Sequence, residues 1–332
     1  MRRRGGTSGY VGPVIAAYAA SFDPSDPLNG LVVGERPGPE ARPGWSVVDV
    51  RAASLNHHDL WSLRGVGLRA EQLPMILGTD AAGVTADGRE VVVHGVIGSL
   101  SAGPDDEPRS LLSEKYDGTL AEQVAVPTAN LVDKPTQLSF VEAACLPTAW
   151  LTAYRMLFVT GRATPGQRVL VQGSGGGLAT AAILLGKAAD LEVIVTGRDE
   201  ERRARALALG AAAAVETGAR VPRVDVVLES VGKATWSHSV RSVKPGGTIV
   251  VAGATSGDAA PAELTRIFFQ EITVAGTTMG SRTDLEDLLA FLARTGVRPL
   301  VDSTYPLAEA RAALGRLAGG SQTGKVVLEV AG

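Results

Sequence analysis

The sequence predicts an α/β protein in which a doubly wound parallel sheet is joined to a mostly antiparallel β domain. Between residues 140 and 296, apolar runs of strand length alternate with helical segments, the pattern of a parallel sheet covered by helices on both faces. Residues 1–139 contain short strand-like runs separated by Gly and Pro, without that alternation. A turn at residues 173–177, rich in glycine, joins a strand to a helix.

The first domain is expected to span residues 1–139 and to take back the C-terminal tail, residues 297–332. Period-two and branched apolar patterns predict its strands at residues 14–18, 31–33, 46–52, 90–94 and 121–126. In the tail, a helix is expected at 307–317 and a strand at 325–330. The tail strand is expected to return to the first domain.

The second domain, residues 140–296, is expected to open with helices at 141–146 and 152–158, separated by a turn at 147–150. Two later helices are expected at 200–209 and 283–295. The predicted strands of the parallel sheet are residues 169–172, 192–196, 212–215, 224–228, 248–252 and 272–275.

Composition excludes several function classes. The chain has 332 residues, 45% of them hydrophobic and 20% charged, which is typical of a globular protein. Its formal net charge of −3 gives no general attraction to nucleic acid or to an anionic membrane, and no apolar stretch reaches membrane-spanning length. The single cysteine, Cys145, rules out a disulfide framework and a cysteine-rich zinc lobe. The basic N-terminus lacks the apolar run of a signal peptide, so a cytoplasmic location is expected.

The glycine-rich turn lies between the strand at 169–172 and a helix. Backbone N–H groups of such a turn, with the N-terminus of the helix, bind a pyrophosphate. Gly173 and Gly175 occupy the first two places of the G-x-G-x-x-G pattern, but Leu178 stands at the third, so the helix must pack differently there. Dinucleotide binding is predicted at Gly173, Ser174, Gly175, Gly176, Gly177 and Leu178.

The end of the next strand indicates which dinucleotide is bound. A carboxylate that selects NAD is expected about 20 residues after the turn. Thr196 and Gly197 stand there instead, and Arg198 follows at once. A guanidinium at this place suits the 2′-phosphate of NADPH, while Asp199 is expected to begin the next helix. The sequence therefore predicts NADPH rather than NADH, with the later arginines of that helix on a solvated face.

Five ordered segments carry a resemblance that extends over residues 13–331. The chain resembles the medium-chain dehydrogenase/reductase superfamily, in which a GroES-like β domain is joined to a Rossmann domain and the C-terminal tail returns to the β domain. The resemblance implies an enzyme, an NADPH-dependent oxidoreductase. The matching segments are residues 52–60 (Ala-Ala-Ser-Leu-Asn-His-His-Asp-Leu), 73–83, 117–123, 146–153 and 225–232.

The resemblance does not extend to the metal ligands of the zinc-dependent members. Their catalytic ligands fall at Asn56, at Thr79, and at Asp80 or a later cysteine, and Asn and Thr are poor zinc ligands. His57 and His58 are adjacent, so on one strand they would point to opposite faces. No metal is expected, and the chain is most similar to the zinc-free quinone oxidoreductases and enoyl reductases.

Without a Lewis acid, hydride transfer suits an acceptor that is already polarised, such as an enone, an enal or a quinone. The resemblance implies that Thr148 lies against the nicotinamide ring, with Thr152 close by. Asn56 is expected either to donate its amide to a substrate oxygen or the nicotinamide carboxamide, or to make a structural hydrogen bond. Asp59 is expected to orient neighbouring groups. The alternative proton donors are His57, His58, Tyr116 and solvent.

The resemblance also implies contacts on the nicotinamide side of the cofactor. Lys325 is expected either to reach the cofactor phosphate or to be a surface lysine. The other expected contacts are Ser230 and Val231 near the nicotinamide ribose, Ala252, Gly253 and Ala254 after the fifth strand, and Thr277 and Met279 near the mouth of the active site.

A small-molecule substrate and a homodimer are expected. Relatives often pair subunits through the last parallel strand, here residues 272–276, and an apolar edge is otherwise prone to aggregation. Two other functions stay open. One is an NADP-dependent alcohol or ketone oxidoreductase that uses side-chain acids instead of zinc, and the other is a non-catalytic NADPH-binding protein.

Overall fold

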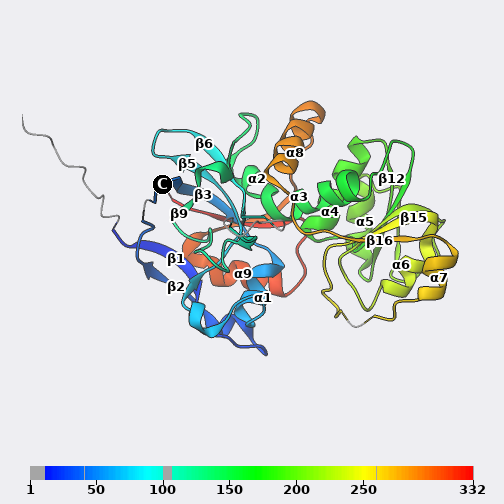
Figure 1. Cartoon of the computed structure of the whole chain (residues 1–332), viewed down its shortest axis with the longest axis horizontal. Helices are drawn as coiled ribbons and strands as arrows, with labels where there is room; N and C mark the ends of the chain where they lie inside the picture. The colour runs from blue at the N-terminus through cyan, green and yellow to red at the C-terminus, as the bar shows by residue number, and fades with distance from the viewer. Residues whose placement is uncertain (1–11, 41, 100–106, 259, 332) are drawn as a thin grey trace, which may run out of the picture.

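The computed structural model describes residues 12–40, 42–99, 107–258 and 260–331. They form two lobes that lie side by side (Figure 1), one holding the N-terminal strands and the other the later strands and most of the helices. No helix within the described ranges is long and apolar enough to cross a membrane. The basic N-terminal residues used in the sequence prediction of location lie outside these ranges.

The first lobe is a β domain built on a seven-stranded sheet. The strands of the whole lobe, which also contains a three-stranded and a two-stranded sheet, are β1 (Val14–Ala19), β2 (Leu31–Arg36), β3 (Trp45–Ser54), β4 (Met75–Ile76), β5 (Asp80–Thr85), β6 (Glu90–Val93), β7 (Val96–Ile97), β8 (Ser110–Leu111), β9 (Gln123–Pro127), β10 (Leu131–Asp133), β17 (Val301–Pro306) and β18 (Lys325–Glu329). The large sheet has the order β10-β6-β5-β3-β18-β17, and β9 also pairs with β3. Only β17 and β18 pair in parallel there, so the expected antiparallel character is confirmed.

The C-terminal tail joins this sheet, as the sequence predicted. β18 pairs antiparallel with β3, with Val327 opposite Ser54 and Glu329 opposite Ala52. Its apolar residues are buried because β3 lies on one side and β17 on the other. The start of β18 therefore lies beside the end of β3, and this juxtaposition positions the site described below.

The second lobe contains a six-stranded parallel sheet of the order β13-β12-β11-β14-β15-β16. The strands are β11 (Arg168–Gln172), β12 (Glu192–Gly197), β13 (Ala213–Glu216), β14 (Val224–Glu229), β15 (Val243–Val251) and β16 (Thr273–Gly276). All neighbouring strands are parallel, which confirms the doubly wound sheet. The order reverses between β11 and β14, and ligands bind such sheets outside the carboxyl ends of the strands at that point.

The described helices cover the parallel sheet, connect the lobes or, for the first and the last of them, pack in the β domain. They are α1 (His57–Leu63), α2 (Phe140–Ala144), α3 (Leu151–Tyr154), α4 (Gly177–Ala188), α5 (Glu200–Leu209), α6 (Trp236–Ser242), α7 (Leu264–Phe269), α8 (Arg282–Thr295) and α9 (Ala310–Ala318). Asp199 begins α5 as expected, since its side chain accepts a hydrogen bond from Arg202 N at 2.8 Å. Trp150 is fully buried in the core that α2, α3 and α4 share with the sheet.

Predictions from the local sequence pattern were wrong at residues 57–58 and at residues 147–150. His57 and His58 lie in the first turn of α1 and not on a strand, because Asn56 and Asp59 form a capping box that starts a helix there. The turn expected at residues 147–150 is a π-helical segment, Leu146–Trp150, so the chain stays helical from α2 through α3. The strands β5 and β17 escaped prediction because small and polar residues dominate them, and only pairing with neighbours makes them strands.

Candidate active site and dinucleotide-binding turn

The glycine turn is open on the side where a ligand would lie. Gly173 has φ +115°, a conformation that favours glycine, and a Cβ at Gly173 or Gly176 would meet nothing within 4 Å. Gly176 precedes α4, whose first N–H groups have no partner within the helix. Free N–H groups and open space at a helix N-terminus fit a pyrophosphate.

Leu178 does not prevent helix α4 from approaching the sheet closely. Its side chain is half-buried against the core. The close approach is made instead at Gly186, two turns further along, where a Cβ would lie 2.5 Å from Val193 Cγ2 of β12. A glycine thus performs the packing role of the third motif glycine at a different position of the helix.

Thr196 and Gly197 were expected near the adenosine ribose. In the structure they contact the glycine turn and the strand that precedes it. Thr196 is 1% exposed, and its hydroxyl donates to Gln172 Oε1 at 2.7 Å. A Cβ at Gly197 would lie 2.2 Å from Ser174 Oγ, so Gly197 makes room for the buried Ser174 side chain. The Thr196 and Ser174 side chains are thus buried, so a contact of either residue with a dinucleotide would be made by its backbone.

The arginines after β12 have different surroundings. Arg198 is exposed, and within the described part of the chain it pairs with no carboxylate. Arg203 instead donates to Gly197 O at 2.8 Å, and Arg205 donates to Thr323 Oγ1 at 3.0 Å. The sequence reasoning missed Arg202, whose Cδ lies 3.0 Å from the place of a Cβ on Gly175. Arg202 is thus a cation beside the turn, and Arg198 is an exposed cation that directly follows Gly197, the glycine in contact with Ser174. The four-residue spacing of Arg198 and Arg202 was the available signal.

A buried polar cluster forms where β3 ends and where β5 and β18 begin. The Lys325 ammonium, 3% exposed, donates to the Leu55 carbonyl at 2.7 Å and to Asn56 Oδ1 at 2.6 Å. It also lies 3.2 Å from Asp80 Oδ2, which accepts from Ser54 Oγ at 2.7 Å. Lys325 is thus committed to this cluster, which corrects both sequence expectations, a phosphate ligand and a surface lysine.

The cluster also uses the Asn56 amide. Asn56 Nδ2 donates to Asp80 Oδ2 at 2.8 Å and lies 3.4 Å from Thr79 Oγ1. With Oδ1 held by Lys325, the geometry favours the structural one of the two roles expected for Asn56. The Thr79 hydroxyl in turn lies 2.9 Å from Thr148 Oγ1, so the expected catalytic residue Thr148 is brought to the edge of the cluster.

Lys325 also connects this cluster to the dinucleotide turn. A Cβ at Gly177 would lie 2.7 Å from Lys325 Cδ, so the lysine stem packs directly against the start of α4. The preceding residue, Gly324, donates its N–H to the Gly175 carbonyl at 2.9 Å. One short segment therefore contacts the turn expected to bind the cofactor and holds the polar cluster of the β domain.

Asp59 orients the backbone, as expected. Its Oδ2 accepts from Asn56 N at 2.8 Å and so caps α1, while its Oδ1 has no partner among the described residues. Burial raises the pKa of this carboxyl to about 6. Removal from water opposes the charged form more strongly than the nearby positive charges support it.

The two histidines of α1 differ in their side-chain contacts and in their exposure to solvent. His58 Nε2 lies 2.9 Å from Glu114 Oε1, and its Nδ1 lies 3.4 Å from Ser113 Oγ. Burial opposes the imidazolium, but the hydrogen bond to Glu114 and nearby carboxylates raise the pKa of His58. His57 is open to solvent, yet its surroundings desolvate the imidazolium and Lys325 repels it, which lowers its pKa.

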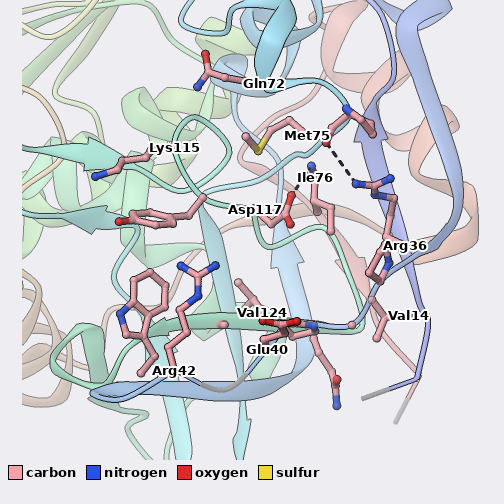
Figure 2. A pocket seen from close by; sticks show the side chains of 18 residues that line it. Val14, Arg36, Glu40, Arg42, Gln72, Met75, Ile76, Lys115, Asp117 and Val124 are labelled. Atoms are coloured by element: carbon pink, nitrogen blue, oxygen red, sulfur yellow. Dashed lines mark hydrogen bonds between the residues drawn. The ribbon is translucent and has the colours of Figure 1, made fainter. Parts of the chain in front are cut away.

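Tyr116, expected as a possible proton donor, lies at a surface pocket and not in the buried polar cluster. Its hydroxyl donates to Glu107 Oε1, and its ring packs edge-on against Trp45 at 4.9 Å between centroids. It lines a surface pocket of about 440 Å³ beside β1 and β9 (Figure 2), where Arg36, Arg42 and Asp117 also lie. None of its contacts belongs to the buried cluster, so it is not placed for proton transfer there.

Apart from Thr152 on α3, the remaining expected residues lie on loops at the carboxyl ends of β14, β15 and β16. Val231 N donates to Glu229 Oε1 at 2.8 Å, so a buried carboxylate missed by the sequence reasoning holds the loop with Ser230. The Ala252–Gly253–Ala254 segment passes close to that loop, since a Cβ at Gly253 would lie 3.2 Å from Ser230 O. Thr277 Oγ1 accepts from Arg155 Nε at 3.0 Å, while Met279 and Thr152 are buried at 4% and 6% exposure.

Comparison with known proteins identifies the family. The domain described as "Alcohol dehydrogenase GroES-like domain" matches residues 42–136, and "Zinc-binding dehydrogenase" matches residues 177–294. A crystal structure of an NAD-dependent alcohol dehydrogenase is 30% identical, with a TM-score of 0.86, over 96% of this chain and 100% of that one. The chain belongs to the medium-chain dehydrogenase/reductase superfamily. It is an oxidoreductase of that superfamily.

Curated relatives in the superfamily have different names. A zinc-type alcohol dehydrogenase-like protein of Schizosaccharomyces pombe is 29% identical over 87% of this chain and 91% of the relative. The quinone oxidoreductase of Mus musculus is 27% identical over 85% and 88%. The acryloyl-coenzyme A reductase of Metallosphaera sedula is 28% identical over 90% and 96%. These identities agree with a nicotinamide-dependent dehydrogenase or reductase and do not specify the substrate.

The description "Zinc-binding dehydrogenase" implies a zinc ion. The residues that this chain has at the expected ligand positions do not suit zinc. The Asn56 oxygen is bound by an ammonium, and Thr79 is a neutral hydroxyl. Asp80 is one carboxylate and already has a cation 3.2 Å away, so a dication beside it would meet like charge. Within the described ranges, no group of three or more His, Cys, Asp or Glu side chains is placed to hold a metal ion.

Proposed function

We propose that the chain is a zinc-independent, NADPH-dependent reductase that transfers hydride to an activated C=C bond, as in an enone or enal, or to a quinone. The observation that carries the proposal is the buried ammonium of Lys325 between Asn56 and Asp80. An internal cation occupies the ligand positions, where it is bound by Asn56 Oδ1 and lies beside Asp80 Oδ2. A conjugated acceptor needs less carbonyl activation than a simple ketone.

When bound, a nicotinamide dinucleotide would supply a hydride for the β-carbon of an enone or enal, or for a quinone. The accompanying proton would be added at the α-carbon of the enone or enal, or at an oxygen of the quinone. The Thr148 hydroxyl is half-buried beside Thr79 and is positioned to donate to the substrate oxygen, on which negative charge develops. Asn56 and Lys325 hold this wall of the site in place. They act through the network and not on the substrate itself.

His57 or solvent is the proposed proton source. His57 is open to solvent, and its lowered pKa keeps the imidazole neutral near pH 7, so it can pass on a proton taken from water. His58 is held by Glu114, and Tyr116 lies at another surface. His57→Gln with measurable residual turnover would identify solvent as an adequate donor.

NADPH is proposed as the cofactor because Arg202 lies beside the turn, Arg198 follows β12 as an exposed cation, and no carboxylate stands at Thr196 or Gly197. A cytoplasmic setting, where thiols such as Cys145 stay reduced, is part of the proposal. Burial raises the pKa of that thiol to about 12, so it takes no part in the chemistry.

The test is oxidation of NADPH and NADH with a quinone, an enal, an enone and a simple ketone, each with and without a chelator. Turnover of the conjugated acceptors or the quinone is expected, with NADPH preferred and no loss on chelation. Turnover of the ketone alone, or loss with chelator, would contradict metal independence. NADPH binding without any turnover would favour a non-catalytic protein.

We also propose a homodimer formed through β16 and α7. β16 is an edge strand of the parallel sheet, and α7 lies at the outer end of this lobe (Figure 1). Phe268 and Phe269 are 61% and 76% exposed, and Val274 on β16 is 44% exposed. An unpaired edge beside exposed aromatic rings is well suited to pair with a second copy.

Sedimentation should give about twice the 34.2 kDa chain mass for the wild type. The double variant Phe269→Glu/Val274→Lys is expected to sediment as a monomer. A wild-type protein that remains monomeric at the highest concentrations would overturn the dimer proposal.

A further inference from the structure

A second cavity, here called the loop cavity, lies between two loops of the β domain. Its volume is about 650 Å³, and its walls include Arg69, Gln72, Arg109, Glu114 and Lys115. Gln72 and Lys115 also line the neighbouring pocket, where Figure 2 labels them. The loop cavity is thus lined by three cationic side chains and one carboxylate.

The charges of the loop cavity do not balance. Lys115 is paired with Glu107 at 2.9 Å, and Glu114 is engaged by His58 at 2.9 Å. Arg69 and Arg109, in contrast, have no carboxylate within ion-pair distance among the residues that the structure describes. Within the described ranges, the Arg109 side chain makes one hydrogen bond, to the Thr278 carbonyl at 3.1 Å.

The environment of Arg109 disfavours its charge. Partial burial and the neighbouring guanidinium of Arg155 lower the pKa of Arg109, and the charge of Glu114 offsets this only in part. Arg155 is itself satisfied by Asp284 and Thr277. Arg109 is thus a half-buried guanidinium beside a second one, and among the described residues it has no counter-ion. A guanidinium in this position has both the charge and the hydrogen-bond donors that bind an anion.

The loop cavity adjoins the proposed active site from two directions. Arg109 contacts Thr278, which follows β16 next to Thr277. Glu114 on the cavity wall contacts His58 of α1, and Asn56, which caps α1, belongs to the buried cluster. Through these contacts the walls of the loop cavity are connected to α1 and to the loop after β16, two elements that carry expected site residues.

We propose that the loop cavity is a substrate subsite for an anionic group, a carboxylate or a phosphate, remote from the bond that is reduced. Arg109 binds the anion with Arg69 beside it, and the acceptor portion extends past α1 to Thr148. The inference rests on the proposed reductase function for its kinetic consequence. The binding of the anion does not depend on turnover.

Two matched pairs of acceptors test the proposal kinetically. 8-Oxonon-6-enoate and 3-nonen-2-one differ only in a terminal carboxylate that lies well away from the C=C bond, and crotonyl-4′-phosphopantetheine and crotonyl-pantetheine differ by one phosphate. In at least one pair, Arg109→Gln is expected to lower the charged-to-neutral ratio of kcat/KM by about 10-fold or more, mainly through KM. The pair that responds distinguishes carboxylate from phosphate. Arg109→Lys should retain part of the ratio, and the exposed control Arg241→Gln on α6 should leave it unchanged.

Calorimetric binding of 8-oxononanoate and of 4′-phosphopantetheine to the holoprotein tests the subsite without catalysis. The wild type should bind one of them at least about 10-fold more tightly than Arg109→Gln. Equal binding by both proteins, or no binding by the wild type, would overturn the subsite even if neutral enones are reduced. Tight, Arg109-dependent binding without reduction of any acceptor would keep the subsite and contradict the reductase function.

Discussion

Lys325→Met is expected to reduce the free energy of unfolding by about 3–5 kcal/mol at neutral pH, the scale for breaking a buried ion pair. Methionine keeps the apolar stem that packs against Gly177, but it removes the one cation among the described residues that contacts the Asp80 carboxylate. Asp80 is 0% exposed, so its charge would be left without compensation. Urea unfolding at several protein concentrations measures the change and separates it from dissociation of subunits.

The double variant Lys325→Met/Asp80→Asn provides the control. Removing both charges leaves no buried carboxylate, so the double variant should be more stable than Lys325→Met alone, by about 2 kcal/mol or more. Lys325→Arg should be intermediate, since it keeps the charge but not the short bonds to Leu55 and Asn56. Additive losses in the double variant would show that Lys325 and Asp80 are not coupled.

Arg198→Ala is expected to weaken NADPH binding by roughly 1–3 kcal/mol, about 5- to 150-fold in Kd, while it spares NADH. The guanidinium has no carboxylate partner among the described residues, so the variant breaks no structural contact that the structure records. Adding Arg202→Ala should enlarge the loss, because that side chain lies beside Gly175. Fluorescence titration with both dinucleotides gives the two Kd values.

Arg205→Ala is the matched control on the same helix. Its side chain is occupied by Thr323 and Glu201, so its loss should change the two Kd values equally or not at all. Equal weakening of NADPH and NADH by Arg198→Ala would contradict the assignment of the 2′-phosphate site.

The parts predicted correctly depend on local pattern. The alternation of strands and helices gave the parallel sheet, and α5 begins at Glu200 because Asp199 is an N-cap wherever the helix later packs. The glycine turn was found from the order of strand, glycines and helix, and the structure has the positive φ at Gly173. The secondary-structure prediction failed where the local sequence pattern fitted more than one structure. His57 and His58 were assigned to a strand because the capping box of Asn56 and Asp59 was overlooked.

The sequence by itself determined the fold class, the dinucleotide turn and the lack of good zinc ligands, since these follow from residue type and from short-range spacing. Only the tertiary structure decided that Lys325 belongs to the site of Asn56 and not to a phosphate, that Tyr116 lies elsewhere, and that Arg202 lies beside Gly175. The Lys325–Leu55 contact joins residues 270 apart in the chain. Such a contact depends on which strands pair, because pairing of β18 with β3 carries the ammonium into the buried cluster, and no local preference encodes that distance.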